Sequence, residues 1–102
     1  MSSSAPDNLA RNTGLHVFFS GNVQGVGFRY RALTVAQKFP VTGWVRNRSD
    51  GRVEMMAEGS EESLEQFLAA LAHEMSEHID KVERVWQPAT GEWARFEIGP
   101  SY

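Results

Sequence analysis

The amino-acid sequence predicts an α+β protein in which two helices cover one face of an antiparallel sheet. Segments rich in β-branched and aromatic residues alternate with two segments whose apolar residues recur at helical spacing. Glycine, proline and Asp-Gly turn signals separate these segments and keep each of them short. The chain has 102 residues, 41% of them hydrophobic, which is typical of a single globular domain.

The first part of the chain predicts a strand, a glycine-rich loop and a helix. Residues 15–20 form a β-rich run that ends at Gly21. Apolar residues then recur at helical spacing from Phe28 onward. Pro40 ends this pattern, because the residue before a proline avoids the helical conformation. We expect the first helix to span residues 28–38.

The middle of the chain predicts a β-hairpin followed by a second helix. Residues 43–47 and 52–58 have strand character, and the Asp-Gly pair between them supplies the positive φ angles that a tight hairpin needs. Ser60 is a typical N-cap, and acidic residues follow it in the first helical turn. The apolar stripe of this second helix consists of Leu64, Phe67, Leu68, Leu71 and Met75.

Two further strands are predicted at residues 81–87 and 93–98, separated by Pro88 and Gly91. The order is therefore β-α-β-β-α-β with an extra C-terminal strand, which is the split βαβ plan of a ferredoxin-like sandwich. We expect one domain over residues 14–102, preceded by a disordered N-terminal tail at residues 1–13. The tail has neither an apolar run nor a basic start, so it predicts no signal peptide and no membrane span.

Cysteine content and charge restrict the function classes. The chain has no cysteine, which excludes a disulfide framework, a thiolate zinc site and a cysteine nucleophile, and which fits a cytoplasmic protein. Residues 14–52 contain six basic residues against one acidic residue, whereas residues 53–102 contain eleven acidic against three basic residues. The basic half could focus an electropositive site for an anionic substrate, or the charges could be scattered over the surface; the sequence leaves both open.

The loop at residues 21–29 has the composition of an anion-binding site. It lies between a predicted strand and a helix N-terminus, where unpaired backbone N–H groups and the helix dipole favour an anion. Its glycines allow close approach of the backbone, and Arg29 can add a forked pair of hydrogen bonds. Taken alone, the pattern also fits a tight connection with an incidental arginine. The phosphate loop of nucleotide hydrolases is excluded because no Gly-Lys-Ser or Gly-Lys-Thr closes the run, and a dinucleotide fingerprint would need glycine at Tyr30.

Residues 21–29, with the sequence GNVQGVGFR, resemble the first signature of the acylphosphatase family. Residues 43–47, with the sequence GWVRN, followed by Gly51, Val53 and Gly59, are similar to the second signature of that family. The resemblance covers roughly residues 15–102 and agrees with the βαββαβ order. The sequence departs from the family pattern at Phe19, where an aliphatic residue is usual, and at residues 39–41, where leucine and glycine are common.

This resemblance implies an enzyme that hydrolyses the carboxyl-phosphate bond of acyl phosphates, acting as a monomer without cofactor or metal. It implies that Arg29 binds the phosphate and that the Asn47 amide orients the attacking water. The expected phosphate-binding loop supplies backbone N–H groups from Gln24, Gly25, Val26, Gly27, Phe28 and Arg29. A small acyl phosphate is the only expected partner, with no nucleic acid and no membrane. Without the resemblance, the preferred interpretation of Asn47 is an ordinary hairpin asparagine that satisfies local backbone groups.

Two other functions compete with this interpretation. Residues 25–30 faintly resemble an aromatic RNA-binding stretch, but such aromatics belong on a sheet face, and the chain as a whole is acidic. The second alternative keeps the same fold but binds an acyl or carbamoyl phosphate for a larger assembly without turnover. We assign no role to the three histidines, which lack metal-ligand spacing, or to the acidic residues of the second helix, which fit a solvated face. These residues are His16, His73, His78, Glu61, Glu62 and Glu65.

Overall fold

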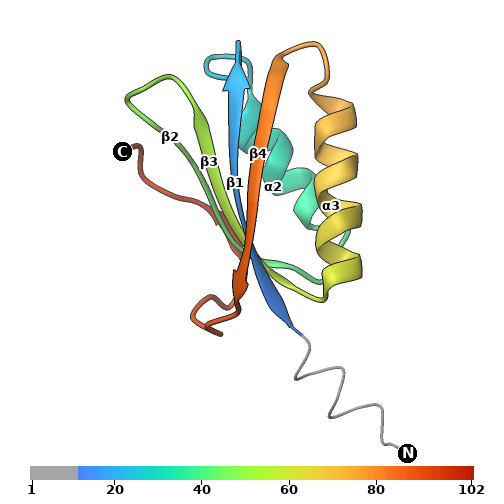
Figure 1. Ribbon diagram of the computed structural model, residues 1–102. Coiled ribbons are helices and arrows are strands. Elements are labelled where there is room, and N and C mark those ends of the chain that lie inside the picture. Colours follow the sequence, from blue (N-terminus) through green and yellow to red (C-terminus); the bar gives the residue numbers. More distant parts are fainter. Residues whose placement is uncertain (1–11) are drawn as a thin grey trace, which may run out of the picture.

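The computed structural model describes residues 12–102, and two helices cover one face of its five-stranded sheet (Figure 1). Every predicted element is present, so the ferredoxin-like α+β fold is confirmed. The elements are β1 (Thr13–Gly21), α2 (Phe28–Ala36), β2 (Thr42–Asn47), β3 (Val53–Gly59), α3 (Glu61–Glu74), β4 (Ile79–Pro88) and β5 (Phe96–Ile98). Of the predicted tail, residues 1–11 lie outside the described residues.

The strands follow the order β4-β1-β3-β2-β5 across the sheet. The pairs β4–β1, β1–β3 and β3–β2 are antiparallel, as expected, whereas β5 lies parallel to β2. The sheet is therefore mixed rather than wholly antiparallel. The parallel pair follows from the connection, because the chain reverses after β4 and crosses to the opposite edge. Strand β5 therefore runs antiparallel to β4. Strand β2, at that opposite edge, also runs antiparallel to β4, so β5 and β2 run in the same direction.

The hydrophobic core fills the space between the sheet and the two helices. The inward residues of β1 and β3 are buried, and so is the whole predicted apolar stripe of α3. Ser60 caps α3 as predicted, because its hydroxyl accepts a hydrogen bond from the Ser63 N–H at 3.1 Å. No helix within residues 12–102 has both the length and the apolar character needed to cross a membrane.

The element boundaries differ from the prediction by one to three residues. Strand β1 already begins at Thr13, which was assigned to the tail, and β4 is longer at both ends than the predicted 81–87. Helix α2 ends at Ala36, before the expected residue 38, because the Lys38 N–H donates to the Val35 carbonyl and tightens the last turn ahead of Pro40. Strand β5 begins at Phe96, after the expected residue 93. The Gly43 N–H nevertheless bonds the Arg95 carbonyl, so backbone pairing begins one residue before the strand.

Two aromatic rings attach the start of α2 to β1. Phe19 and Phe28 are both buried, and their ring centroids lie 4.8 Å apart. Phe19, the aromatic residue that departs from the family pattern, thus packs directly against Phe28, the first residue of α2. This contact packs the first turn of α2 against the sheet.

Candidate active site

The loop between β1 and α2 has a backbone that only glycine adopts readily. Gly25 and Gly27 have φ angles of 77° and 79°, in the left-handed region that other residues disfavour. A Cβ atom built on either glycine would meet no heavy atom within 4 Å, so the space beside both residues is open. Val23, at the start of the loop, is buried in the core. The loop backbone after Val23 is therefore curved and open, while its start is held by the core.

A run of backbone N–H groups in this loop has no acceptor within the described protein. Those of residues 24–30 donate no hydrogen bond to any other residue in the described part of the chain. Gly27 is the N-cap of α2 and offers no side-chain cap. Free N–H groups at a helix N-terminus, together with the helix dipole, form an anion-binding arrangement. This geometry fits the anion-binding role predicted for the loop, which stays a prediction.

Arg29 lies in the first turn of α2, directly after this loop. Its guanidinium makes no hydrogen bond or ion pair with other residues between 12 and 102. In the same range, Lys38 and Arg95 are also unpaired, but they follow α2 and precede β5, respectively. Arg29 is therefore the cation that both adjoins the loop and remains available for a ligand.

Asn47 is the last residue of β2 and lies opposite Val53 of β3. Directly paired residues share one face of a sheet, and Val53 is buried in the core, so the Asn47 side chain lies on the helix-covered face. Its side-chain amide makes no hydrogen bond within the described residues. Satisfaction of local hairpin groups, the alternative left open by the sequence, therefore does not account for this asparagine.

Gln24 joins the loop to the β2–β3 hairpin, and the loop before α2 and this hairpin lie at the same end of the molecule (Figure 1). The Gln24 Nε2 donates to the carbonyl oxygens of Arg48, at 2.7 Å, and Arg52, at 2.9 Å. From the sequence, Gln24 was expected to contribute only its backbone N–H group to phosphate binding. No local pattern indicates that its side chain has partners 24 and 28 residues away.

A second polar cluster, which the sequence did not predict, lies on the open face of the sheet around Glu54. Glu54 is only 4% exposed. Its carboxylate accepts hydrogen bonds from His16 at 2.7 Å and from Arg46 and Arg48, each at 3.0 Å. Burial alone would raise the pKa of Glu54, but these three hydrogen bonds outweigh it and leave the pKa below its ordinary value of 4.5.

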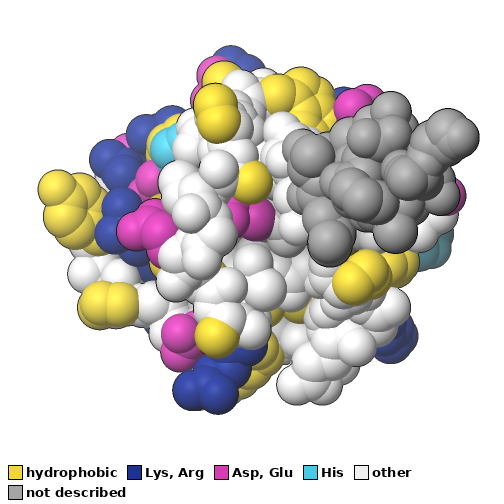
Figure 2. Space-filling view, turned by 90° about the horizontal axis from the view of Figure 1, so that it is seen from below, with side chains coloured by type: hydrophobic (Ala, Val, Ile, Leu, Met, Phe, Trp, Pro, Cys, Tyr) yellow, Lys and Arg dark blue, Asp and Glu magenta, His cyan; other side chains and the backbone are white. Residues whose placement is uncertain are grey.

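Ion pairs in and beside this cluster show where the basic charge of residues 14–52 lies in the folded protein. Arg46 and Arg48 pair with Glu54, and Arg52 pairs with Asp50, so much of the basic charge of the first half is neutralised away from the loop. Viewed from below, basic and acidic side chains lie together along one flank, with a histidine among them (Figure 2). The scattered-charge alternative thus describes these arginines better than an electropositive field at the loop.

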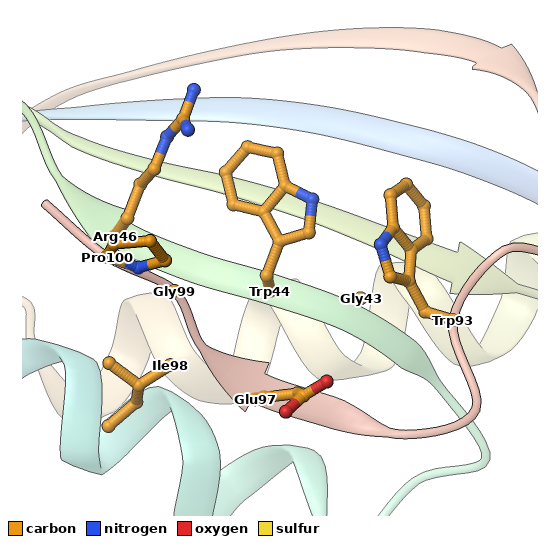
Figure 3. A pocket seen from close by; sticks show the side chains of 8 residues that line it. All are labelled: Gly43, Trp44, Arg46, Trp93, Glu97, Ile98, Gly99 and Pro100. Atoms are coloured by element: carbon orange, nitrogen blue, oxygen red, sulfur yellow. The ribbon is translucent and has the colours of Figure 1, made fainter. Parts of the chain in front are cut away.

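A cavity of about 310 Å³ lies beside β2 and β5, away from the loop (Figure 3). Trp44 and Arg46 project into it from β2, on the face opposite to that of Val45 and Asn47. Within residues 12–102 no three histidine or acidic side chains are grouped as metal ligands.

The fold is that of a small ferredoxin-like α+β protein, with a glycine loop that presents free N–H groups beside an arginine. The model of the acylphosphatase family matches residues 15–98. The chain belongs to the acylphosphatase family, and its fold and family are those of acylphosphatase enzymes.

Individual relatives agree with this assignment. An acylphosphatase of Roseiflexus sp. is 44% identical over 85 residues, which cover 81% of this chain and 90% of that protein. An acylphosphatase of Bacillus velezensis is 57% identical over 56 residues, which cover 55% of this chain and only 62% of that relative.

Solved structures with this fold include both a small protein and part of a larger one. The acylphosphatase of Bacillus subtilis superimposes with a TM-score of 0.77 at 34% identity, over 85% of this chain and 98% of that chain. HypF of T. kodakarensis superimposes with a TM-score of 0.73 at 30% identity, over 85% of this chain but only 12% of that chain.

The Glu54 cluster generates a prediction about stability and pH. Because the folded-state pKa of Glu54 is depressed, its ionised form stabilises the fold above pH 4.5, and this contribution disappears as the pH falls through the folded-state pKa. Glu54→Gln should therefore lower the free energy of unfolding at pH 7, with a deficit that shrinks toward about pH 3. Urea unfolding across this range measures the difference. Glu97→Gln, at an exposed glutamate, is the control; a deficit independent of pH would contradict the assignment.

Proposed function

We propose that this chain hydrolyses the carboxyl-phosphate bond of acyl phosphates to a carboxylate and inorganic phosphate. The observation that carries the proposal is the run of free N–H groups at residues 24–30 beside the unpaired Arg29, in a chain of the acylphosphatase family. The proposal needs no cofactor or metal. It places the protein in the cytoplasm, as a monomer whose partner is a small acyl phosphate.

In this proposal the loop and Arg29 hold the phosphoryl group. Backbone N–H groups of residues 24–29 surround the phosphate oxygens, and the positive end of the α2 dipole adds to their attraction. The planar guanidinium of Arg29 donates two parallel hydrogen bonds to the same group. Charge that develops on the equatorial oxygens during transfer is then stabilised by donors already in place, so little reorganisation is needed during the reaction.

The Asn47 side-chain amide orients the water that attacks phosphorus in line with the breaking bond. As the new phosphorus–oxygen bond forms, the bond to the acyl oxygen breaks and its electron pair leaves on the carboxylate. The conjugate acid of this leaving group has a pKa of about 4, so no general acid is required for its departure. Positioning and electrostatics therefore supply most of the proposed catalysis, and no side chain is assigned as general base.

The likeness to one part of HypF favours a second candidate function. The same fold covers only 12% of that chain, so it also occurs within a larger protein. In this second candidate function, the chain holds an acyl or carbamoyl phosphate for a larger assembly and does not hydrolyse it. The two candidates share phosphate binding and differ only in turnover.

An activity assay with a simple acyl phosphate tests the proposal and separates the two candidates. We expect turnover that a strong chelator leaves unchanged and that inorganic phosphate inhibits competitively, because phosphate occupies the same N–H groups as the substrate. Phosphate binding without turnover would favour the second candidate. Activity that is lost on chelation and restored by Mg²⁺ would contradict the metal-free account.

Arg29 is the first residue to test by mutation. Arg29→Ala should leave the fold intact and lower kcat/KM by roughly a thousandfold, because a charge-assisted contact with the transition state is lost. Arg29→Lys should not restore the rate, since an ammonium lacks the planar fork. Arg95→Ala, at another unpaired arginine of the described chain, is the matched control and should keep wild-type kinetics. Near-normal turnover in folded Arg29→Ala would exclude the proposed site.

Asn47 separates placement of water from binding of phosphate. Asn47→Ala should lower kcat and kcat/KM similarly, by about a hundredfold, while the inhibition constant of inorganic phosphate stays close to that of the wild type. Asn47→Asp should impair both binding and turnover, because it adds a negative charge near an anion and replaces donors with acceptors. Steady-state kinetics after circular dichroism provides the comparison. A raised KM with normal kcat in Asn47→Ala would assign this residue to substrate binding instead.

A further inference from the structure

The side chain of Gln24 attaches the phosphate loop to the β2–β3 hairpin. A primary amide has two N–H donors, and both are used, because Nε2 bonds the carbonyl oxygens of Arg48 at 2.7 Å and Arg52 at 2.9 Å. Both acceptors belong to the hairpin that follows Asn47, whereas Gln24 belongs to the loop that precedes Arg29. We call these two hydrogen bonds the Gln24 clasp.

The clasp is attached to a part of the hairpin that other contacts already fix. The Arg48 N–H donates to the Arg52 carbonyl at 2.9 Å, and the Arg52 N–H donates to the Asp50 carboxylate at 3.1 Å. The Arg48 guanidinium also bonds the buried Glu54 at 3.0 Å on the open face of the sheet. The carbonyl oxygens that receive the Gln24 amide therefore belong to residues that other hydrogen bonds hold in place, and they give the loop a fixed reference position.

The loop has no comparable attachment of its own. Val23 and Phe28 are buried at its two ends. Between them, Gln24 is the sole residue of the described loop whose side chain makes a hydrogen bond. Loss of the clasp would leave the curvature and the free N–H groups of the loop in place. It would remove the contact that sets the loop's position relative to Asn47.

We propose that Gln24 is a positioning residue for the hydrolysis, whose side-chain amide sets the distance between the phosphate loop and Asn47. This inference rests on the proposed function of the site. The backbone N–H of Gln24 binds phosphate whatever its side chain is, so the clasp contributes to kcat and little to phosphate affinity. A displacement of about 1 Å can lower the rate of a positioned attack by about a hundredfold.

Gln24→Met tests the clasp, because methionine keeps the side-chain length and the backbone N–H but donates no hydrogen bond. We expect kcat to fall by about 10- to 100-fold, with a change of less than about threefold in the inhibition constant of inorganic phosphate. Gln37→Met makes the same replacement at an exposed glutamine beyond α2 and should keep the wild-type kcat. An unchanged kcat in folded Gln24→Met overturns the proposal.

A double-mutant cycle with Asn47→Ala separates positioning from a general loss of structure. If Gln24 acts through Asn47, then Gln24→Met lowers kcat much less in the Asn47→Ala protein than in the wild type. Independent effects that multiply in the double mutant would mean that Gln24 does not act through Asn47, and would overturn the proposal.

Gln24→Glu adds a signature in the pH profile and replaces Gln24→Met if that variant fails to fold. Its carboxylate faces two carbonyl oxygens and donates nothing, whereas the protonated carboxyl donates one hydrogen bond. This environment disfavours the charged form and raises the pKa of the introduced carboxyl. The ratio of its kcat to that of the wild type should therefore rise as the pH is lowered from about 7 to about 5. A ratio that does not change with pH contradicts the clasp.

Backbone amide hydrogen exchange tests the Gln24 clasp without measuring turnover. A failure of the clasp can therefore be distinguished from a failure of the proposed function. The Arg48 N–H bonds the same Arg52 carbonyl that accepts from Gln24. Its protection should fall in Gln24→Met but not in Gln37→Met. A wild-type protein that hydrolyses no acyl phosphate would refute the proposed function. Unchanged protection of Arg48 in Gln24→Met would refute the clasp, whether or not the wild type is active.

Discussion

Seven consecutive backbone N–H groups, those of residues 24–30, have no acceptor within the described protein, and the surrounding structure keeps them together on one curved surface. Backbone N–H groups are strong donors that proteins rarely leave without a partner, so this run requires water or an anion. Burial of Val23 and Phe28 at either end prevents the loop from collapsing onto the sheet to satisfy them. The hydrophobic core therefore maintains a polar surface that the loop alone could not hold.

The register of the β2–β3 hairpin decides what this surface faces. Along β2, Trp44 and Arg46 lie on the open face of the sheet, whereas Val45 and Asn47 lie on the helix-covered face. A slip of one residue in the pairing would exchange the two sets and turn Asn47 away from the helix-covered face. The tight turn at residues 48–52 fixes the register, so turn chemistry at the hairpin determines the composition of the site.

Local patterns were sufficient to predict the elements, the Ser60 cap, the glycine loop and the hairpin, because each depends on residues close together in the chain. Features set by distant pairs were missed. The pairing of β5 depends on which edge remains free after β4, and the Gln24 and Glu54 contacts join residues up to 38 positions apart. Counting charge by halves of the chain was misleading for the same reason, since Glu54 was assigned to the acidic half although it neutralises arginines of the basic half.

The same distinction between local and distant contacts separates the two candidate functions. In the proposed function, the loop and Arg29 hold the phosphate, and they are contiguous in sequence in any protein that keeps this strand, loop and helix. In the same proposal, hydrolysis also needs a water that Asn47 orients, and Asn47 lies on a different element. The relation between the two depends on strand register and on the position of the hairpin against the loop. A relative could thus keep the whole phosphate-binding loop and lose turnover through a change in its hairpin alone, so the loop sequence by itself does not distinguish a hydrolase from a binding module.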